Sequence, residues 1–123
     1  MSSEQAVSKL LQDNLVLVFS ETSHEKRLQG LHRLWSPNGD CLFIDHFGVF
    51  KNHNDISILV GTLLDKFVGK VFSVRGSVQI LAYDEENDIQ IARLLWTFGD
   101  ILGEDVATIA QGRIQKMYTF IDE

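Results

Sequence analysis

The 123-residue chain has the length of one domain and a formal net charge of −6, with 45% hydrophobic and 23% charged residues. This composition is typical of a globular protein with its own core, so we expect a single domain over residues 1–123. The 11 Lys and Arg residues are scattered along the chain. Because nucleic acids and anionic membranes are bound by clustered cations, the pattern argues against both as partners.

Three features of the sequence predict a cytoplasmic protein. No uninterrupted apolar run approaches the roughly 20 residues of a membrane-spanning helix. The first residues, Met1 to Gln5, lack the basic and apolar regions of a secretion signal. Cys41 is the one cysteine, so an intrachain disulfide is impossible, as is usual in a reducing compartment.

Two helices are expected first along the chain. Apolar residues recur at helical intervals over about residues 4–19, and Ser2 with Gln5 has the spacing of a capping box. A second apolar stripe follows Thr22, which forms a similar box with Glu25. A turn sequence with proline and glycine ends this second helix.

A short strand and a third helix come next. Residues 41–47 are mostly apolar and predict a strand that ends at Gly48. An apolar stripe from Ile56 to Phe67 then predicts a helix whose first turn is capped by Asn52 or Asn54.

The second half of the chain predicts four antiparallel strands. Polar or glycine-containing turns separate apolar segments at residues 70–83, 89–99, 104–110 and 113–121. Helices followed by a run of strands indicate an α+β fold. The segment 89–99 is apolar on both faces, so we expect one face to pack on helices and the other on a partner.

Buried acids are the strongest chemical signal. The chain lacks a phosphate-binding glycine loop, and its four histidines lack metal-ligand spacing, so we expect no cofactor and no metal. Asp45 and Asp105, in contrast, lie within apolar strands. Burial raises the pKa of a carboxyl group and suits it to proton transfer near neutral pH. An aspartate that is merely hydrogen-bonded at a sheet edge is the structural alternative.

Three stretches of sequence resemble a known group of proteins. They are Leu34-Trp35 with residues 43–48, residues 93–97 with 103–106, and the final segment 111–120. In this order they resemble the nuclear transport factor 2-like superfamily, specifically its SnoaL-like and ketosteroid isomerase-like branch. The resemblance implies a cone, in which a curved antiparallel sheet wraps around N-terminal helices and leaves an apolar pocket open at one end. It also implies a homodimer formed through the outer sheet face.

The resemblance assigns roles to the two acids. It places Asp45 at the general base and Asp105 at the protonated acid that donates a hydrogen bond to a forming oxyanion. The isomerases also carry a tyrosine on the first helix, where this chain has Asn14 or Leu15. Asn14 would be a weaker donor, or it would simply cap or bridge helices. Aromatic residues are expected to line a pocket for a ring-containing ligand: Phe43, Phe47, Trp96, Phe98, Tyr118 and Phe120.

The functional expectation is an isomerase or polyketide cyclase-like enzyme that moves protons on an apolar carbonyl substrate. A dehydratase would need a His–Asp pair, but His46 and Asp45 are strand neighbours that point to opposite faces. Epoxide hydrolysis would need an arginine between two acids, and Arg93 fits that spacing poorly. A ligand-binding or interaction module without catalysis, including a dimer that stores or senses an apolar ligand, is the alternative.

Overall fold

The computed structural model describes residues 3–122, so Ser2, one of the expected capping residues, lies outside the described part. Helices and a single sheet make up the fold, which is of the α+β class that the sequence predicted. The helical segments are α1 (Glu4–Asn14), the π-helical turn η1 (Leu15–Phe19), α2 (His24–Leu34) and α3 (His53–Lys66). The strands are β1 (Leu42–Asp45), β2 (Gly48–Phe50), β3 (Phe72–Asp84), β4 (Ile89–Phe98), β5 (Ile101–Ala110) and β6 (Arg113–Asp122).

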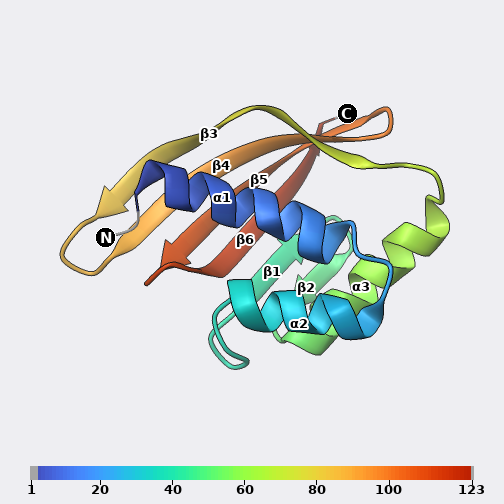
Figure 1. Cartoon of the computed structure of the whole chain (residues 1–123), viewed down its shortest axis with the longest axis horizontal. Helices are drawn as coiled ribbons and strands as arrows, with labels where there is room; N and C mark the ends of the chain where they lie inside the picture. The colour runs from blue at the N-terminus through green and yellow to red at the C-terminus, as the bar shows by residue number, and fades with distance from the viewer. Residues whose placement is uncertain (1–2, 123) are drawn as a thin grey trace.

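The sheet has six strands in the order β2-β1-β6-β5-β4-β3. The predicted antiparallel run from β3 to β6 is confirmed. Two features were not predicted: β1 pairs with β6 in parallel, and Gly48 begins a further strand instead of only ending one. Figure 1 shows α1 lying across one face of the sheet, with α2 and α3 beside the β1–β2 hairpin.

The helices begin at polar residues that satisfy their free backbone N–H groups. The Ser23 side chain caps α2 by accepting from the Lys26 N–H, one residue later than the expected cap at Thr22. Asn52, not Asn54, caps α3 and accepts from the Asp55 N–H. Such caps satisfy donors that the first turn of a helix leaves without a partner.

Curvature lets the sheet enclose the helices. β3 departs from regular pairing with β4 between Arg75 and Gln79. Gly76 lies in this segment with φ +75°, a left-handed conformation that glycine adopts at little cost. Irregularities of this kind bend a strand and increase its twist. The alternation of buried and exposed residues along β4 and β5 then directs one sheet face into the core.

The described helices are all too short or too polar to cross a lipid bilayer. Cys41 is buried just before β1, where it packs as a small core residue. Gly61 on α3 faces the buried guanidinium group of Arg27 on α2, since a Cβ there would lie 2.7 Å from Nη2. The absent side chain at Gly61 therefore allows the two helices to pack closely.

Candidate functional site

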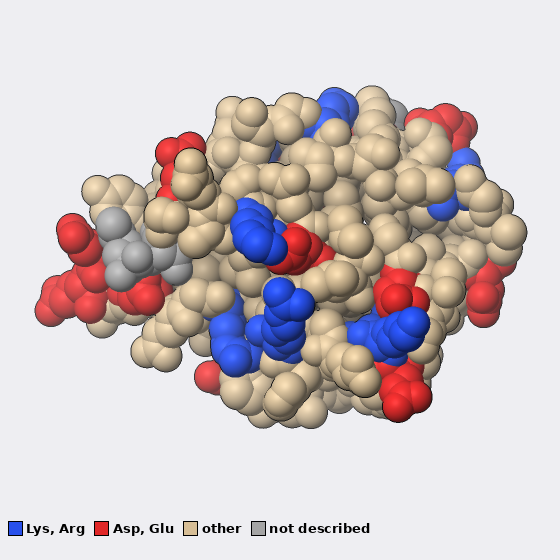
Figure 2. All heavy atoms as spheres, viewed as in Figure 1, with Lys and Arg blue, Asp and Glu red and all other residues tan. Residues whose placement is uncertain are grey.

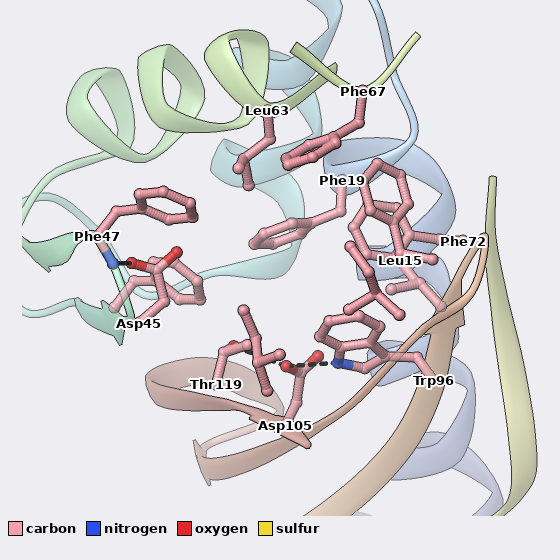
Figure 3. A pocket seen from close by; sticks show the side chains of 14 residues that line it. Leu15, Phe19, Asp45, Phe47, Leu63, Phe67, Phe72, Trp96, Asp105 and Thr119 are labelled. Carbon is pink, nitrogen blue, oxygen red and sulfur yellow. Dashed lines mark hydrogen bonds between the residues drawn. The ribbon is translucent and has the colours of Figure 1, made fainter. Parts of the chain in front are cut away.

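An apolar cavity of about 90 Å³ lies where the helices meet one end of the sheet. Its walls come from η1, the β1–β2 hairpin, the end of α3 and the adjoining ends of β3, β4, β5 and β6. Eleven of the lining side chains are hydrophobic, and Asp45, Asp105 and Thr119 are the three polar ones. Figure 3 shows both carboxyl groups among the aromatic rings that line the cavity.

Asp105 is the buried acid of the site, with 4% of its surface exposed. It lies on β5 and accepts two hydrogen bonds at Oδ1, from Thr119 Oγ1 at 2.7 Å and from Trp96 Nε1 at 3.0 Å (Figure 3). Burial raises the pKa of Asp105 to about 6, and the two donors oppose this rise because they stabilise the charged form. The group therefore changes its protonation state near neutral pH.

Asp45 is the second acid and lies at the end of β1, where it is half-buried. Its Oδ1 accepts the backbone N–H of Phe47 at 2.8 Å within the tight turn to β2. Burial raises the pKa of Asp45, while the backbone N–H groups of Phe47 and Gly48 lower it. Those donors favour a carboxylate that is able to accept a proton.

Aromatic rings form most of the cavity wall. Phe72 stacks on Phe98 with ring centroids 4.1 Å apart and meets the Trp96 ring edge-on at 5.3 Å. Phe19, from the π-helical turn, reaches Phe43 at 5.4 Å. Such pairs stabilise each other beyond their buried area, so this wall has a defined shape. Phe47 lies at the rim, with 48% of its surface exposed.

The structure places Asn14 outside the cavity lining. Its side chain is buried at the end of α1, where Oδ1 accepts the indole N–H of Trp35 at 2.8 Å and Nδ2 contacts the Met117 sulfur at 3.8 Å. Both ends of the amide are therefore occupied in joining α1 to the chain after α2 and to β6. Leu15, the other residue expected at this position, does line the cavity.

Tyr118 and Phe120 also lie outside the cavity lining, and their pairing with Val106 and Glu104 places them on the outer face of the sheet. They border a separate hollow that Asp45 and Thr119 also line. A regular hairpin from the β5–β6 turn would pair Asp105 with Tyr118, and paired residues share a face. A register shift at Thr108 changes this pairing, so Asp105 lies opposite Thr119 instead. Because side chains alternate along a strand, a shift of one residue moves each of them to the other face.

Thr119 is the polar residue of the site that sequence reasoning missed. Nothing in its local sequence marks it, because a threonine in a strand is common. The register of the β5–β6 pair would have identified it, but only with the shift at Thr108 taken into account. Phe43, Phe47, Trp96 and Phe98, which the sequence named as pocket residues, all line the cavity together with both acids.

Charges are mixed on the face that Figure 2 shows, where basic side chains stand close to acidic ones. On α1, for example, Lys9 pairs with Asp13 at 2.6 Å. Among residues 3–122 no group of histidine, cysteine and acidic side chains could hold a metal ion. His53 is buried and hydrogen-bonds the Ser36 carbonyl, which is a packing role.

No protein-family model matches the chain, and no curated protein matches it by sequence. Solved structures do match along nearly its whole length. A candidate isomerase of the SnoaL-like family from Agrobacterium tumefaciens is 20% identical, with a TM-score of 0.76 over 97% of this chain and 99% of that one. A nuclear transport factor 2-like superfamily protein from Salmonella enterica is 14% identical, with a TM-score of 0.77 over 98% and 91% of the two chains.

LinA is 13% identical, with a TM-score of 0.69 over 97% of this chain and 85% of that protein. Several other matching structures are of proteins whose function is unknown. At these identities the matches show a shared fold, and one fold can have many different functions. The three helices and the curved, unclosed sheet of this chain thus form the nuclear transport factor 2-like fold.

Proposed function

We propose that the protein is an isomerase- or cyclase-type enzyme that moves a proton on an apolar, ring-containing carbonyl compound. The observation that carries this proposal is the pairing of two unlike carboxyl groups in one apolar cavity. Asp45 is half-buried and held by backbone donors, whereas burial of Asp105 shifts it toward the neutral acid and raises its pKa to about 6. Acids with different surroundings take different protonation states, and proton transfer needs both a base and a donor.

In this mechanism Asp45 acts as the base. It removes a proton from the carbon next to the carbonyl group, and the electron pair moves onto the carbonyl oxygen. Protonated Asp105 donates a hydrogen bond to that oxygen, which stabilises the negative charge as it forms. Asp45 then returns the proton to another carbon, so an isomerisation is complete without a redox partner.

The cavity also limits the substrate. Its lining holds two acids and no basic side chain, so an anionic group would meet a carboxylate in apolar surroundings. Its volume of about 90 Å³ is below the roughly 150 Å³ of a cavity known to take up benzene. A neutral compound of one ring that is only partly inserted fits these limits.

The experiment uses a β,γ-unsaturated cyclohexenone, whose conjugated product absorbs in the ultraviolet. We expect Asp45→Asn to lower kcat at least about 100-fold, because general base catalysis typically contributes that much. The fold should be unchanged, since an Asn oxygen still accepts the Phe47 N–H. Asp55→Asn, on the exposed first turn of α3, is the matched control and should retain turnover. Turnover by Asp45→Asn at the wild-type rate would contradict the proposed base.

A binding protein without catalysis is the second candidate, favoured by one feature of the site. The cavity lining contains no tyrosine that could donate a second hydrogen bond to a developing oxyanion. Asp105 is therefore the one acid opposite Asp45 that could stabilise it. This candidate predicts that the cyclohexenone binds without conversion. Isothermal titration together with the absorbance assay separates the two functions.

We also propose a homodimer formed through the outer face of β4, β5 and β6. Apolar side chains are exposed on this face, among them Ile91 and Phe120. An ion pair joins Arg93 and Glu104 across β4 and β5 at 2.6 Å, which provides a polar contact within the apolar surface. The buried, free Cys41 supports a reducing, cytoplasmic setting for this dimer.

A further inference from the structure

Gly103 occupies an unusual position for a glycine, in the interior of β5. Glycine weakens a strand because it loses more backbone freedom on folding and leaves nothing to pack. The backbone at Gly103 is not in the left-handed region, so its conformation is open to other residues. The reason for a glycine must therefore be the space around it.

The indole ring of Trp96 fills that space. Trp96 on β4 is the direct partner of Gly103 in the sheet register. A Cβ atom at Gly103 would lie 2.2 Å from Cζ2, 2.4 Å from Cη2 and 2.7 Å from Cε2 of the ring. Atoms never approach this closely, so any side chain at Gly103 would displace the indole from the strand.

The position of the ring determines where its N–H points. Because the indole lies across Gly103, Nε1 reaches Asp105, the next inward-facing residue on β5, at 3.0 Å (Figure 3). Thr119 donates to the same oxygen from β6. Oδ1 of Asp105 thus receives two donors, and a proton on this carboxyl group belongs on Oδ2.

We propose that Gly103 is a positioning residue that aims the Trp96 N–H at Oδ1 of Asp105 and so leaves Oδ2 to face the ligand. Gly103 acts through the indole ring and touches no substrate itself. This role concerns Asp105 in the cavity already described, and it identifies Oδ2 as the atom that would donate the hydrogen bond. Its importance for the mechanism rests on the proposed function. Its test measures hydrogen bonding and titration instead of turnover, so either proposal can fail without the other.

The test is a double-mutant cycle with Gly103→Ala and Trp96→Phe, in which the carboxyl titration of Asp105 is followed by carbon NMR. The Trp96 donor stabilises the charged form, so its loss raises the pKa of Asp105 above about 6. We expect each single variant to lower the acid ionisation constant at least about threefold. The double variant should shift it no further than Trp96→Phe, because both changes remove one interaction.

Leu102→Ala is the matched control, because this residue lies on the same strand but on its outward face, and it should leave the titration unchanged. An unchanged titration in folded Gly103→Ala would overturn the proposal, as would shifts that add in the double variant. If Gly103→Ala does not fold, Trp96→Phe should restore folding, since phenylalanine lacks the second ring that meets the Cβ. Failure of that rescue would also overturn it.

Discussion

At the scale of single residues, Asp105 combines two opposing effects. Its burial favours the neutral acid, and the hydrogen bonds from Trp96 and Thr119 favour the carboxylate. Burial is the larger effect, so the folded protein binds the proton more tightly than the unfolded chain does, whose aspartates have a pKa near 3.9. Burial therefore makes Asp105 a better hydrogen-bond donor, but it also lowers the free energy of unfolding once the carboxyl group has lost its proton.

Asp105→Asn tests this cost. Stability from the raised pKa is fully present below about pH 4 and is lost as the pH rises through about 6. Two pKa units correspond to about 3 kcal/mol, which wild type should lose by about pH 8. The asparagine oxygen still accepts both hydrogen bonds and does not titrate.

Urea denaturation near pH 4 and near pH 8 measures the free energy of unfolding of both proteins. We expect their difference to change by about 3 kcal/mol in favour of Asp105→Asn between these two conditions. Asp100→Asn is the control, because the hydrogen bond from Lys70 lowers the pKa of that surface acid, so any pH-dependent difference in stability should have the opposite sign. A difference between Asp105→Asn and wild type that stays constant with pH would show that Asp105 titrates normally.

Two residues of the site illustrate what the sequence could reveal. Asp45 and Asp105, which line the cavity, were predicted because a charged residue within an apolar strand is conspicuous. Thr119 and Gly103 were not found, because their roles depend on which residue lies opposite them. Pairing register is a property of two strands, and one extra residue in β6, Gln115, changed it beyond what the turn alone predicts.

At the scale of elements, the boundaries of α2 and α3 were predictable to within a residue or two, whereas the helix expected over about residues 4–19 divides into α1 and the π-helical turn η1. Asn52 and Asn54 both had the chemistry of a cap for α3, and local sequence did not distinguish them. The structure does, because Asn52 has extended backbone angles and accepts the Asp55 N–H at 2.8 Å. The parallel pairing of β1 with β6 was less accessible, since it joins segments that are far apart in the chain.

The two asparagines offer a matched pair of variants. We expect Asn52→Ala to lower the free energy of unfolding by about 1 kcal/mol, because it removes the hydrogen bond that caps α3. Asn54→Ala, one residue inside the helix and exposed, should change it by less than about 0.5 kcal/mol. Chemical denaturation of both variants provides the measurement, and equal effects would contradict the cap assignment.

At the scale of the whole molecule, the two faces of the sheet have different surroundings. Its inner face holds the core and the cavity, while its outer face leaves apolar side chains in contact with water. Tyr118 marks this separation, because the sequence assigned it to the pocket and the register turns it outward, opposite Val106. An apolar sheet face of this kind is typical of surfaces that associate.

Tyr118→Asp tests whether two copies of the chain meet through this outer face. Burying a carboxylate at an apolar interface without a partner is costly, so we expect a wild-type dimer to become a monomer at the same concentration. Light scattering coupled to size-exclusion chromatography measures the mass directly. Ile58→Asp places the same charge at an exposed apolar residue of α3, away from the sheet, and should leave the dimer intact. Because Tyr118 lies outside the cavity lining, binding of the cyclohexenone should persist in the monomer, and a monomeric wild type would refute the proposed interface.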